Sequence, residues 1–226
     1  MKLLLNKLPL AALAFSTGLT VATPTYAEPP NLTCVKNELK KYHDSGRYEK
    51  DLTQVIEKAQ HYINQQARIN KKRTNPKNLA IVLDIDETSL SNYNYMIKRD
   101  FSGTKAEFHQ DVMAAKSPAI KPTLNLYKDA INRGVTVFFI TGRRKPEANA
   151  TAKNLHRAGY HQWAGLYLRP SDYNQKSVIP FKSHTRELII QKGYTIIATI
   201  GDQYSDLNGG YAEKGFKLPN PYYYLP

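Results

Sequence analysis

Three short, almost wholly apolar runs constrain the fold of this chain more than any other feature of its sequence. They cover residues 79–83, 135–140 and 196–200, they are rich in β-branched side chains, and a shorter run covers 166–168. A strand with one face in water alternates apolar and polar residues, whereas a strand covered on both faces is apolar throughout. The sequence therefore predicts a parallel sheet buried between two layers of helices.

Helical patterns separate these runs and support this interpretation. The three predicted helices cover residues 124–133, 146–158 and 184–191. Each is followed within two residues by a glycine, the residue best suited to ending a helix. This alternation predicts the fold class α/β, with an open parallel sheet, right-handed crossovers and helices on both faces.

The first 27 residues have the composition of an export signal. Lys2 and Lys7 precede an uncharged apolar stretch at 8–22, and residues 25–27 are of the kind that a signal peptidase cleaves after. The stretch is shorter than the roughly 20 residues of a membrane-spanning helix. We therefore expect an exported protein, periplasmic or secreted, with no transmembrane segment; an uncleaved N-terminal anchor is the alternative.

Beyond this signal, we predict two further parts. The signal peptide covers 1–27, an N-terminal linker and helical segment covers 28–78, and an α/β core covers 79–226. A small cap insert is expected at about 89–121 of the core. The helical segment is predicted because apolar residues recur at helical spacing between residues 52 and 63.

The balance of charges limits the partners of the chain. Its 32 basic and 19 acidic residues give a net charge of +13, and loss of residues 1–27 removes two lysines and leaves +11. Such a charge favours anionic partners such as phosphorylated small molecules, acidic lipid or nucleic acid. No repeated basic and aromatic pattern indicates specific nucleic-acid binding. The single cysteine, Cys34, excludes an intrachain disulfide, and we expect it to be a small buried residue.

Acidic residues follow two of the apolar runs. Asp84 and Asp86 follow the first run, and Asp202 and Asp206 follow the last. The carboxyl ends of parallel strands meet at one edge of a sheet, where ligands bind. Carboxylates that converge there repel one another unless a cation neutralises them, and oxygen ligands favour Mg²⁺ over zinc. A magnesium site is therefore predicted; solvated loop acids are the alternative.

Two further segments suit an anionic ligand. Thr141, Gly142 and Arg143 follow the second run, where a hydroxyl and backbone N–H groups can hold a phosphate oxygen. An ordinary N-cap threonine and turn glycine are the alternative. Lys182 lies just before a predicted helix and can balance negative charge at the same edge, unless it is a surface lysine.

Taken in order, these segments resemble the four motifs of the haloacid dehalogenase superfamily. The matching segments are Asp84 to Thr88, Thr141 to Arg143, Lys182, and Gly201 to Asp206. Finer features resemble its exported acid phosphatases, the class B and class C enzymes of subfamily IIIB, and their plant storage-protein relatives. These features are the stretches 85–92, 181–186 and 216–223.

The resemblance implies a hydrolase, an Mg²⁺-dependent acid phosphatase that cleaves small phosphomonoesters through a phospho-aspartate. It implies that Asp84 is the nucleophile and Asp86 the general acid and base, with a raised pKa, and that Lys182 is also catalytic. The metal ligands would be the side chains of Asp84 and Asp202 and the backbone carbonyl of Asp86, with Asp206 bound directly or through a water.

The resemblance also implies a set of substrate-binding residues. These are Thr88, which would orient Asp86, together with Thr141, Gly142, Arg143 and Tyr95. Arg143 is expected either to clamp the substrate or to point outward.

Aromatic residues of the cap insert bear on the choice of substrate. Tyr95 is expected at the mouth of the site, where it would contact a nucleobase or aryl group. Phe101 and Phe108 are expected to pack the insert onto the sheet. We expect nucleotides to be preferred substrates, and the sequence is compatible with an oligomer.

Other functions remain open on the sequence alone. A non-enzymatic storage or phosphate-ligand-binding relative would keep the same fold. A phospho-accepting receiver domain fits less well, because its acid pair and its phosphorylated Asp follow different strands. A Walker-type nucleotidase is excluded, because G-x-x-x-x-G-K-[ST] is absent.

Overall fold

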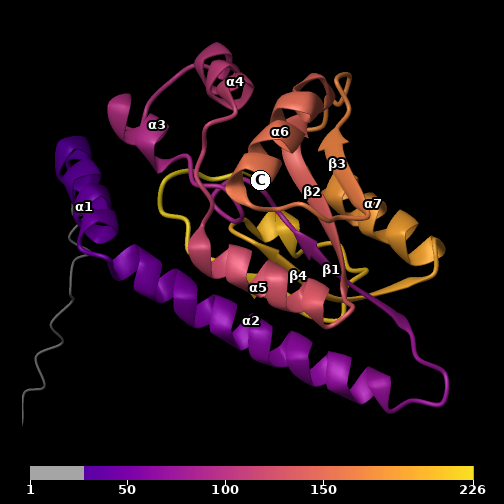
Figure 1. The fold of residues 1–226 in the computed structure, drawn as a ribbon. Helices are drawn as coiled ribbons and strands as arrows, with labels where there is room; N and C mark the ends of the chain where they lie inside the picture. Colours follow the sequence, from indigo (N-terminus) through magenta and orange to yellow (C-terminus); the bar gives the residue numbers. More distant parts are fainter. Residues whose placement is uncertain (1–27, 226) are drawn as a thin grey trace, which may run out of the picture. The chain divides into compact units, whose positions relative to one another are not determined.

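The helices and strands of the protein alternate along the chain as the sequence predicts (Figure 1). The computed structural model describes residues 28–225, so the predicted signal peptide lies outside the described residues. The chain divides into two units, Met1–Asn31 and Leu32–Pro226, and every described helix and strand belongs to the second.

The first elements of this unit are α1 (Leu32–Asp44), α2 (Arg47–Lys71), β1 (Asn78–Leu83), α3 (Tyr93–Lys98), α4 (Lys105–Ala114) and α5 (Lys121–Asn132). The others are β2 (Thr136–Arg144), η1 (Lys145–Glu147), α6 (Ala148–Ala158), β3 (Gly165–Arg169), α7 (Ile179–Gln191), β4 (Tyr194–Gly201), η2 (Tyr204–Asp206) and β5 (Gly215–Lys217).

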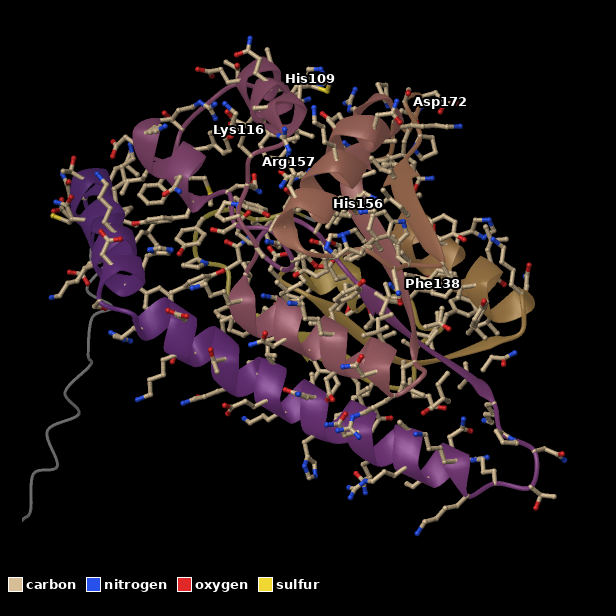
Figure 2. All side chains as sticks on the ribbon, in the orientation of Figure 1. His109, Lys116, Phe138, His156, Arg157 and Asp172 are labelled. Atoms are coloured by element: carbon tan, nitrogen blue, oxygen red, sulfur yellow. The ribbon has the colours of Figure 1, made fainter. Side chains whose placement is uncertain are left out.

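A five-stranded parallel sheet lies at the centre of this unit, in the order β3-β2-β1-β4-β5. Side chains of β1 alternate between its faces. Ile81 and Leu83 join the core beneath α2 and α5, whereas Ala80 and Val82 join the core beneath α7. Phe138, labelled in Figure 2, belongs to the α7 side. The predicted α/β class, with helices on both faces, is therefore confirmed.

Two details of the sheet position the site. Leu83 at the end of β1 pairs with Ile200 of β4, so the residues that follow these strands emerge side by side. Between β2 and β3, Thr141 pairs with Leu168 and Arg144 pairs with Arg169. The two intervening residues of β2 therefore have no partner on β3. Such a bulge re-aims the end of a strand, and bulges are frequent beside active sites.

The helical segment at the N-terminal side packs against the core. Leu52, Ile56 and Ile63 of α2 are buried at helical spacing, and this helix lies along α5 and the sheet. By contrast, α1 buries none of its residues, and Cys34 on it is exposed. The expectation of a buried Cys34 is therefore wrong, because α1 lies at the surface of this unit. No helix in the described part of the chain combines the length and apolar character needed to cross a membrane.

The segment between β1 and α5 carries α3 and α4 and leaves the core through a narrow neck. Leu90 forms an antiparallel bridge with Ala119, and Ser91 N donates to Pro118 O at 2.9 Å. Ser117 Oγ donates to Asn92 Oδ1 at 2.7 Å.

At its far end this segment also touches the core. His109 of α4, labelled in Figure 2, has its Nδ1 2.8 Å from Oε1 of Glu147 in η1. The segment is thus fixed to the core at both its base and its outer helix.

Replacement of Ile56 by Ala tests the role of α2. Ile56 is fully buried against the core, so Ile56→Ala should lower the free energy of unfolding by about 2–5 kcal/mol, as read from urea denaturation. The matched control is Ile69→Ala on the exposed side of the same helix, with an expected loss of about 0.5 kcal/mol or less. Equal losses would mean that α2 is not packed as described.

Candidate active site

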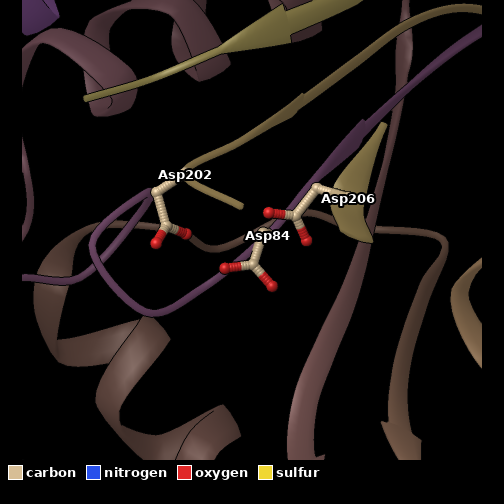
Figure 3. A group of neighbouring side chains, drawn as sticks. All are labelled: Asp84, Asp202 and Asp206. Carbon is tan, nitrogen blue, oxygen red and sulfur yellow. The ribbon is translucent and has the colours of Figure 1, made fainter. Parts of the chain in front are cut away.

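Three buried carboxylates meet at the carboxyl ends of β1 and β4. Asp84 follows β1, while Asp202 and Asp206 follow β4, and one oxygen of each lies within 4.8 Å of the others. Figure 3 shows the three side chains gathered in one place. The structure thus brings together acids that lie more than 100 residues apart in the sequence, as the pairing of β1 with β4 requires.

Asp202 is held by three side-chain donors. Its Oδ1 accepts from Thr88 Oγ1 at 3.1 Å, and its Oδ2 accepts from Gln203 Nε2 at 2.8 Å and from Asn220 Nδ2 at 2.6 Å. Thr88 therefore contacts Asp202 and not Asp86, the residue that it was expected to orient. Gln203 and Asn220 were not predicted, although both lie in segments that the sequence analysis compared with the phosphatases.

The loop that carries Asp206 is clamped by a buried arginine. Arg186 donates from Nη1 to Asp206 O at 2.9 Å and from Nε to Gly210 O at 2.7 Å, and a third bond reaches Asn208 O. Thr199 Oγ1 also donates to Asp206 O at 3.0 Å. Because the Arg186 side chain is fully buried, its loss would deprive the carbonyls of Asn208 and Gly210 of this donor.

Lys182 lies between two of the carboxylates. It occupies the first turn of α7, which begins at Ile179, earlier than predicted, because Pro180 suits the first turn of a helix. Its Nζ donates to Asp84 Oδ1 at 2.9 Å and to Asp206 Oδ1. Burial lowers the pKa of Lys182, but the charges of Asp206 and Asp84 raise it more, so the group stays an ammonium.

One lysine does not neutralise this cluster. Burial raises the pKa of Asp84, and Asp206 adds to the rise while Lys182 opposes it. Burial and then the charge of Asp206 also raise the pKa of Asp202. This excess of buried negative charge, presented by oxygen atoms alone, fits a divalent cation of the hard, oxygen-preferring kind. Asp84, Asp202 and Asp206 are the side chains that would hold it.

Asp86 points away from this cluster toward an arginine. Arg143 donates from Nη2 to Asp86 Oδ1 at 2.7 Å and from Nε to both oxygens at 3.1 Å, and Asn92 Nδ2 donates to Oδ1 at 2.7 Å. Burial raises the pKa of Asp86, but Arg143 and Asn92 outweigh burial and lower it overall. The expectation that the pKa of Asp86 is raised is therefore wrong for the protein without a bound ligand. Arg143 is itself buried, which rules out an outward-facing charge.

The bulge of β2 shapes the other side of the site. Thr141 Oγ1 accepts from the backbone N of Arg143 at 3.1 Å, so the threonine closes a local turn and does not cap a helix. Gly142 lines the cavity together with Asp84 and Lys182, and Thr141 lies buried behind it.

Asp84, Asp202 and Lys182 line a cavity of about 420 Å³, and five aromatic side chains line it as well. Tyr95 lines it, as expected from the sequence. Phe108 also lines it and is 44% exposed, so the expectation that it packs onto the sheet is wrong. Phe101 stacks on Tyr222 of the C-terminal tail, with ring centroids 5.9 Å apart, and lines the same cavity.

Glu87 is a buried acid at the site that the sequence analysis did not assign. Its Oε1 accepts from Asn92 N at 2.6 Å and its Oε2 accepts from Tyr223 OH at 3.2 Å, so it joins the neck of the α3–α4 segment to the tail. Burial, followed by the charge of Asp86, raises its pKa to about 8. Its backbone φ of 51° is unusual for a residue with a side chain.

A parallel α/β sheet with this cluster at its edge defines the haloacid dehalogenase class of fold, and comparison with known proteins agrees. The class C acid phosphatase from Bacillus anthracis superposes with a TM-score of 0.67 at 22% identity, covering 85% of this chain and 86% of that one. A family model for the HAD superfamily, subfamily IIIB (acid phosphatase), matches residues 15–226. The chain therefore belongs to this family, which confirms the family predicted from the sequence.

Two plant relatives show how the family varies. The chain is 37% identical over 148 residues to Acid phosphatase 1 of Solanum lycopersicum, covering 64% of this chain and 58% of that protein. It is 34% identical over 149 residues to Vegetative storage protein 2 of Arabidopsis thaliana, covering 64% of this chain and 56% of that protein. The chain thus matches somewhat more than half the length of each of these relatives.

Replacement of Gly201 by Ala tests the packing around Asp206. A Cβ at position 201 would collide with the Asp206 side chain, so Gly201→Ala should weaken Mg²⁺ binding about 10- to 100-fold, as measured by titration calorimetry. Gly193→Ala is the control, because a Cβ there meets open space and the glycine lies far from the acids in the fold. Unchanged Mg²⁺ affinity in Gly201→Ala would show that Asp206 does not need this space.

Proposed function

We propose that the chain is an exported, Mg²⁺-dependent acid phosphatase that hydrolyses small phosphomonoesters through a phospho-aspartate intermediate. The observation that carries this proposal is the buried cluster of Asp84, Asp202 and Asp206 with Lys182, which opens into a cavity. Its place at the carboxyl end of a parallel sheet is where ligands bind in this class of fold.

Asp84 is the proposed nucleophile. A carboxylate oxygen of Asp84 attacks phosphorus, the bond from phosphorus to the ester oxygen breaks, and the leaving alcohol takes a proton from Asp86. Water then attacks the phospho-aspartate, Asp86 takes the proton of that water, and phosphate leaves with Asp84 restored. Lys182, within 2.9 Å of Asp84, favours the charged form of the nucleophile.

Asp86 is proposed to carry the proton between these steps. Arg143 and Asn92 fix the orientation of its carboxylate and keep it ionised, which suits the second step, in which it acts as a base. A phosphate anion that enters the cavity adds negative charge beside Asp86 and raises its pKa toward that of a proton donor. The substrate thus prepares Asp86 for the first step.

The metal would be held by Asp84, Asp202 and Asp206. When bound, Mg²⁺ supplies positive charge that offsets the negative charge of the phosphoryl oxygens. Backbone N–H groups at Gly142 and the ammonium of Lys182 are proposed to hold those oxygens from the protein side.

The aromatic side chains of the cavity favour a leaving alcohol that carries an aryl ring or a nucleobase. Tyr95, Phe101 and Phe108 come from the α3–α4 segment, and Tyr222 and Tyr223 come from the tail. Flat apolar rings of this kind stack well on nucleobases, so nucleotides are the proposed preferred substrates. Export is proposed from the basic and apolar composition of residues 1–27.

Storage or ligand binding without turnover is the second candidate function, because one relative is named a vegetative storage protein. A chain of that kind would bind phosphate in the cavity and release no alcohol. The presence of Asp84, Asp86 and Lys182 in one site favours the enzyme.

Removal of the nucleophile separates these candidates. With p-nitrophenyl phosphate at acid pH, Asp84→Asn should lower kcat about 1,000-fold or more, because an amide cannot form the phospho-enzyme. Asp129→Asn, at a surface ion pair on α5, should retain wild-type activity. Turnover at the wild-type rate in Asp84→Asn would refute the assignment of the nucleophile, and an inactive wild-type chain would favour the storage role.

Removal of the metal makes an independent test. Dialysis against EDTA should abolish hydrolysis, and added Mg²⁺ should restore it and raise the melting temperature, because the ion offsets repulsion among the buried acids. Full activity in the presence of EDTA would contradict the proposed use of Mg²⁺.

A further inference from the structure

Arg169 is a cation of the cavity for which no hydrogen-bond or ion-pair partner is found among residues 28–225. It is the last residue of β3 and lines the same cavity as Asp84 and Lys182. Its Nε is buried and donates no hydrogen bond, and Arg169 forms no ion pair with any residue from 28 to 225. A buried guanidinium N–H without an acceptor costs free energy. Such a group usually donates a hydrogen bond to a ligand or to a water molecule.

The surroundings of Arg169 make an anionic ligand the natural partner. Its register partner on β2 is a second arginine, Arg144, and the nearest ring is that of Tyr173, 5.9 Å from the guanidinium carbon. Burial and then the charge of Arg144 lower the pKa of Arg169, against smaller effects of Tyr173 and Glu147. Two neighbouring cations therefore repel each other in a site that an anion would stabilise.

Three acids near this end of the molecule are already engaged, whereas Asp172, three residues after Arg169, is exposed. Asp86 is bound by Arg143, and Glu147 lies 2.8 Å from the ring nitrogen of His109. Asp111, which also lines the cavity, pairs with Arg99 at 2.5 Å. None of these carboxylates is within ion-pair distance of Arg169.

The register of the sheet places Arg169 close to the reaction centre. Leu168 pairs with Thr141, and neighbouring strands lie about 4.8 Å apart, so Arg169 begins beside the bulge that carries Gly142. A molecule with a phosphate between Gly142 and Lys182 would therefore have another part of its surface within reach of Arg169.

We propose that Arg169 binds a second anionic group of the substrate, a carboxylate or a phosphate carried by the leaving alcohol. A phosphomonoester whose alcohol bears a further negative charge would then be preferred over one with the same alcohol uncharged. The fork of the guanidinium suits both groups, because it donates two parallel hydrogen bonds to either. This proposal rests on the proposed function, which places the phosphate that is hydrolysed between Gly142 and Lys182.

The kinetic test compares phenyl phosphate with 3- and 4-carboxyphenyl phosphate. The wild-type chain should prefer at least one carboxylated ester by kcat/KM. Arg169→Gln should reduce this preference by about 10- to 100-fold, which corresponds to the loss of a charged hydrogen bond. Arg144→Gln removes the same charge one strand away, outside the cavity lining, and should leave the preference within about twofold. An equal effect of both variants would mean general attraction by charge and would overturn the assignment to Arg169.

A binding test keeps this proposal separate from the proposed function. Benzylphosphonate and its 3- and 4-carboxy derivatives are titrated by calorimetry into wild type and Arg169→Gln, and no hydrolysis is needed. Tighter binding of a carboxylated compound by wild type alone supports the proposal even if the chain has no turnover. Equal affinities of the plain and carboxylated compounds would overturn it.

The source of the anion is settled by inhibition with inorganic phosphate. If the anion that Arg169 binds is part of the substrate, inorganic phosphate should be a purely competitive inhibitor. Free phosphate then competes with the ester for one site. Non-competitive inhibition that disappears in Arg169→Gln would show a separate anion site and would overturn the proposal.

Discussion

Mutual repulsion among buried carboxylates is the constraint on which the site depends. The pairing of β1 with β4 brings together Asp84, Asp202 and Asp206. Their negative charges repel one another and would favour a larger separation. Lys182 offsets part of this charge, and the three acids are arranged so that they could hold a cation that offsets the rest. The surrounding clamps, above all the buried guanidinium of Arg186, keep the acids from moving apart. The protein thus holds a strained arrangement of charge ready for a ligand, at a cost that its core must offset.

The fold and the central acids were predictable because they depend on local patterns. Apolar runs predict strands that are covered on both faces, and parallel strands bring their following residues to one edge. This reasoning placed Asp84 beside Asp202 without knowledge of any contact. The boundaries of the helices were less predictable. The structure begins α7 at Ile179 and not at residue 184, because Pro180 is part of its first turn.

The parts that the sequence could not predict depend on contacts between distant segments. The pKa of Asp86 is set by Arg143, 57 residues away, so nothing adjacent to Asp86 indicates that it is lowered. Phe108 is aromatic and was assigned to packing, yet it lines the cavity because its helix stands on a neck above the core. Residues such as Asn220 act through single hydrogen bonds from the tail, for which no pattern of spacing exists.

The neck at Asn92 and Ser117 has a consequence for how such proteins change over time. The residues between these two positions join the core at this base and again where His109 meets Glu147. A stretch attached in this way can be lengthened, shortened or exchanged as a cassette while the strands below it keep their register. Natural selection can therefore alter the lining of the cavity contributed by this stretch and leave the acids at the edge of the sheet unchanged.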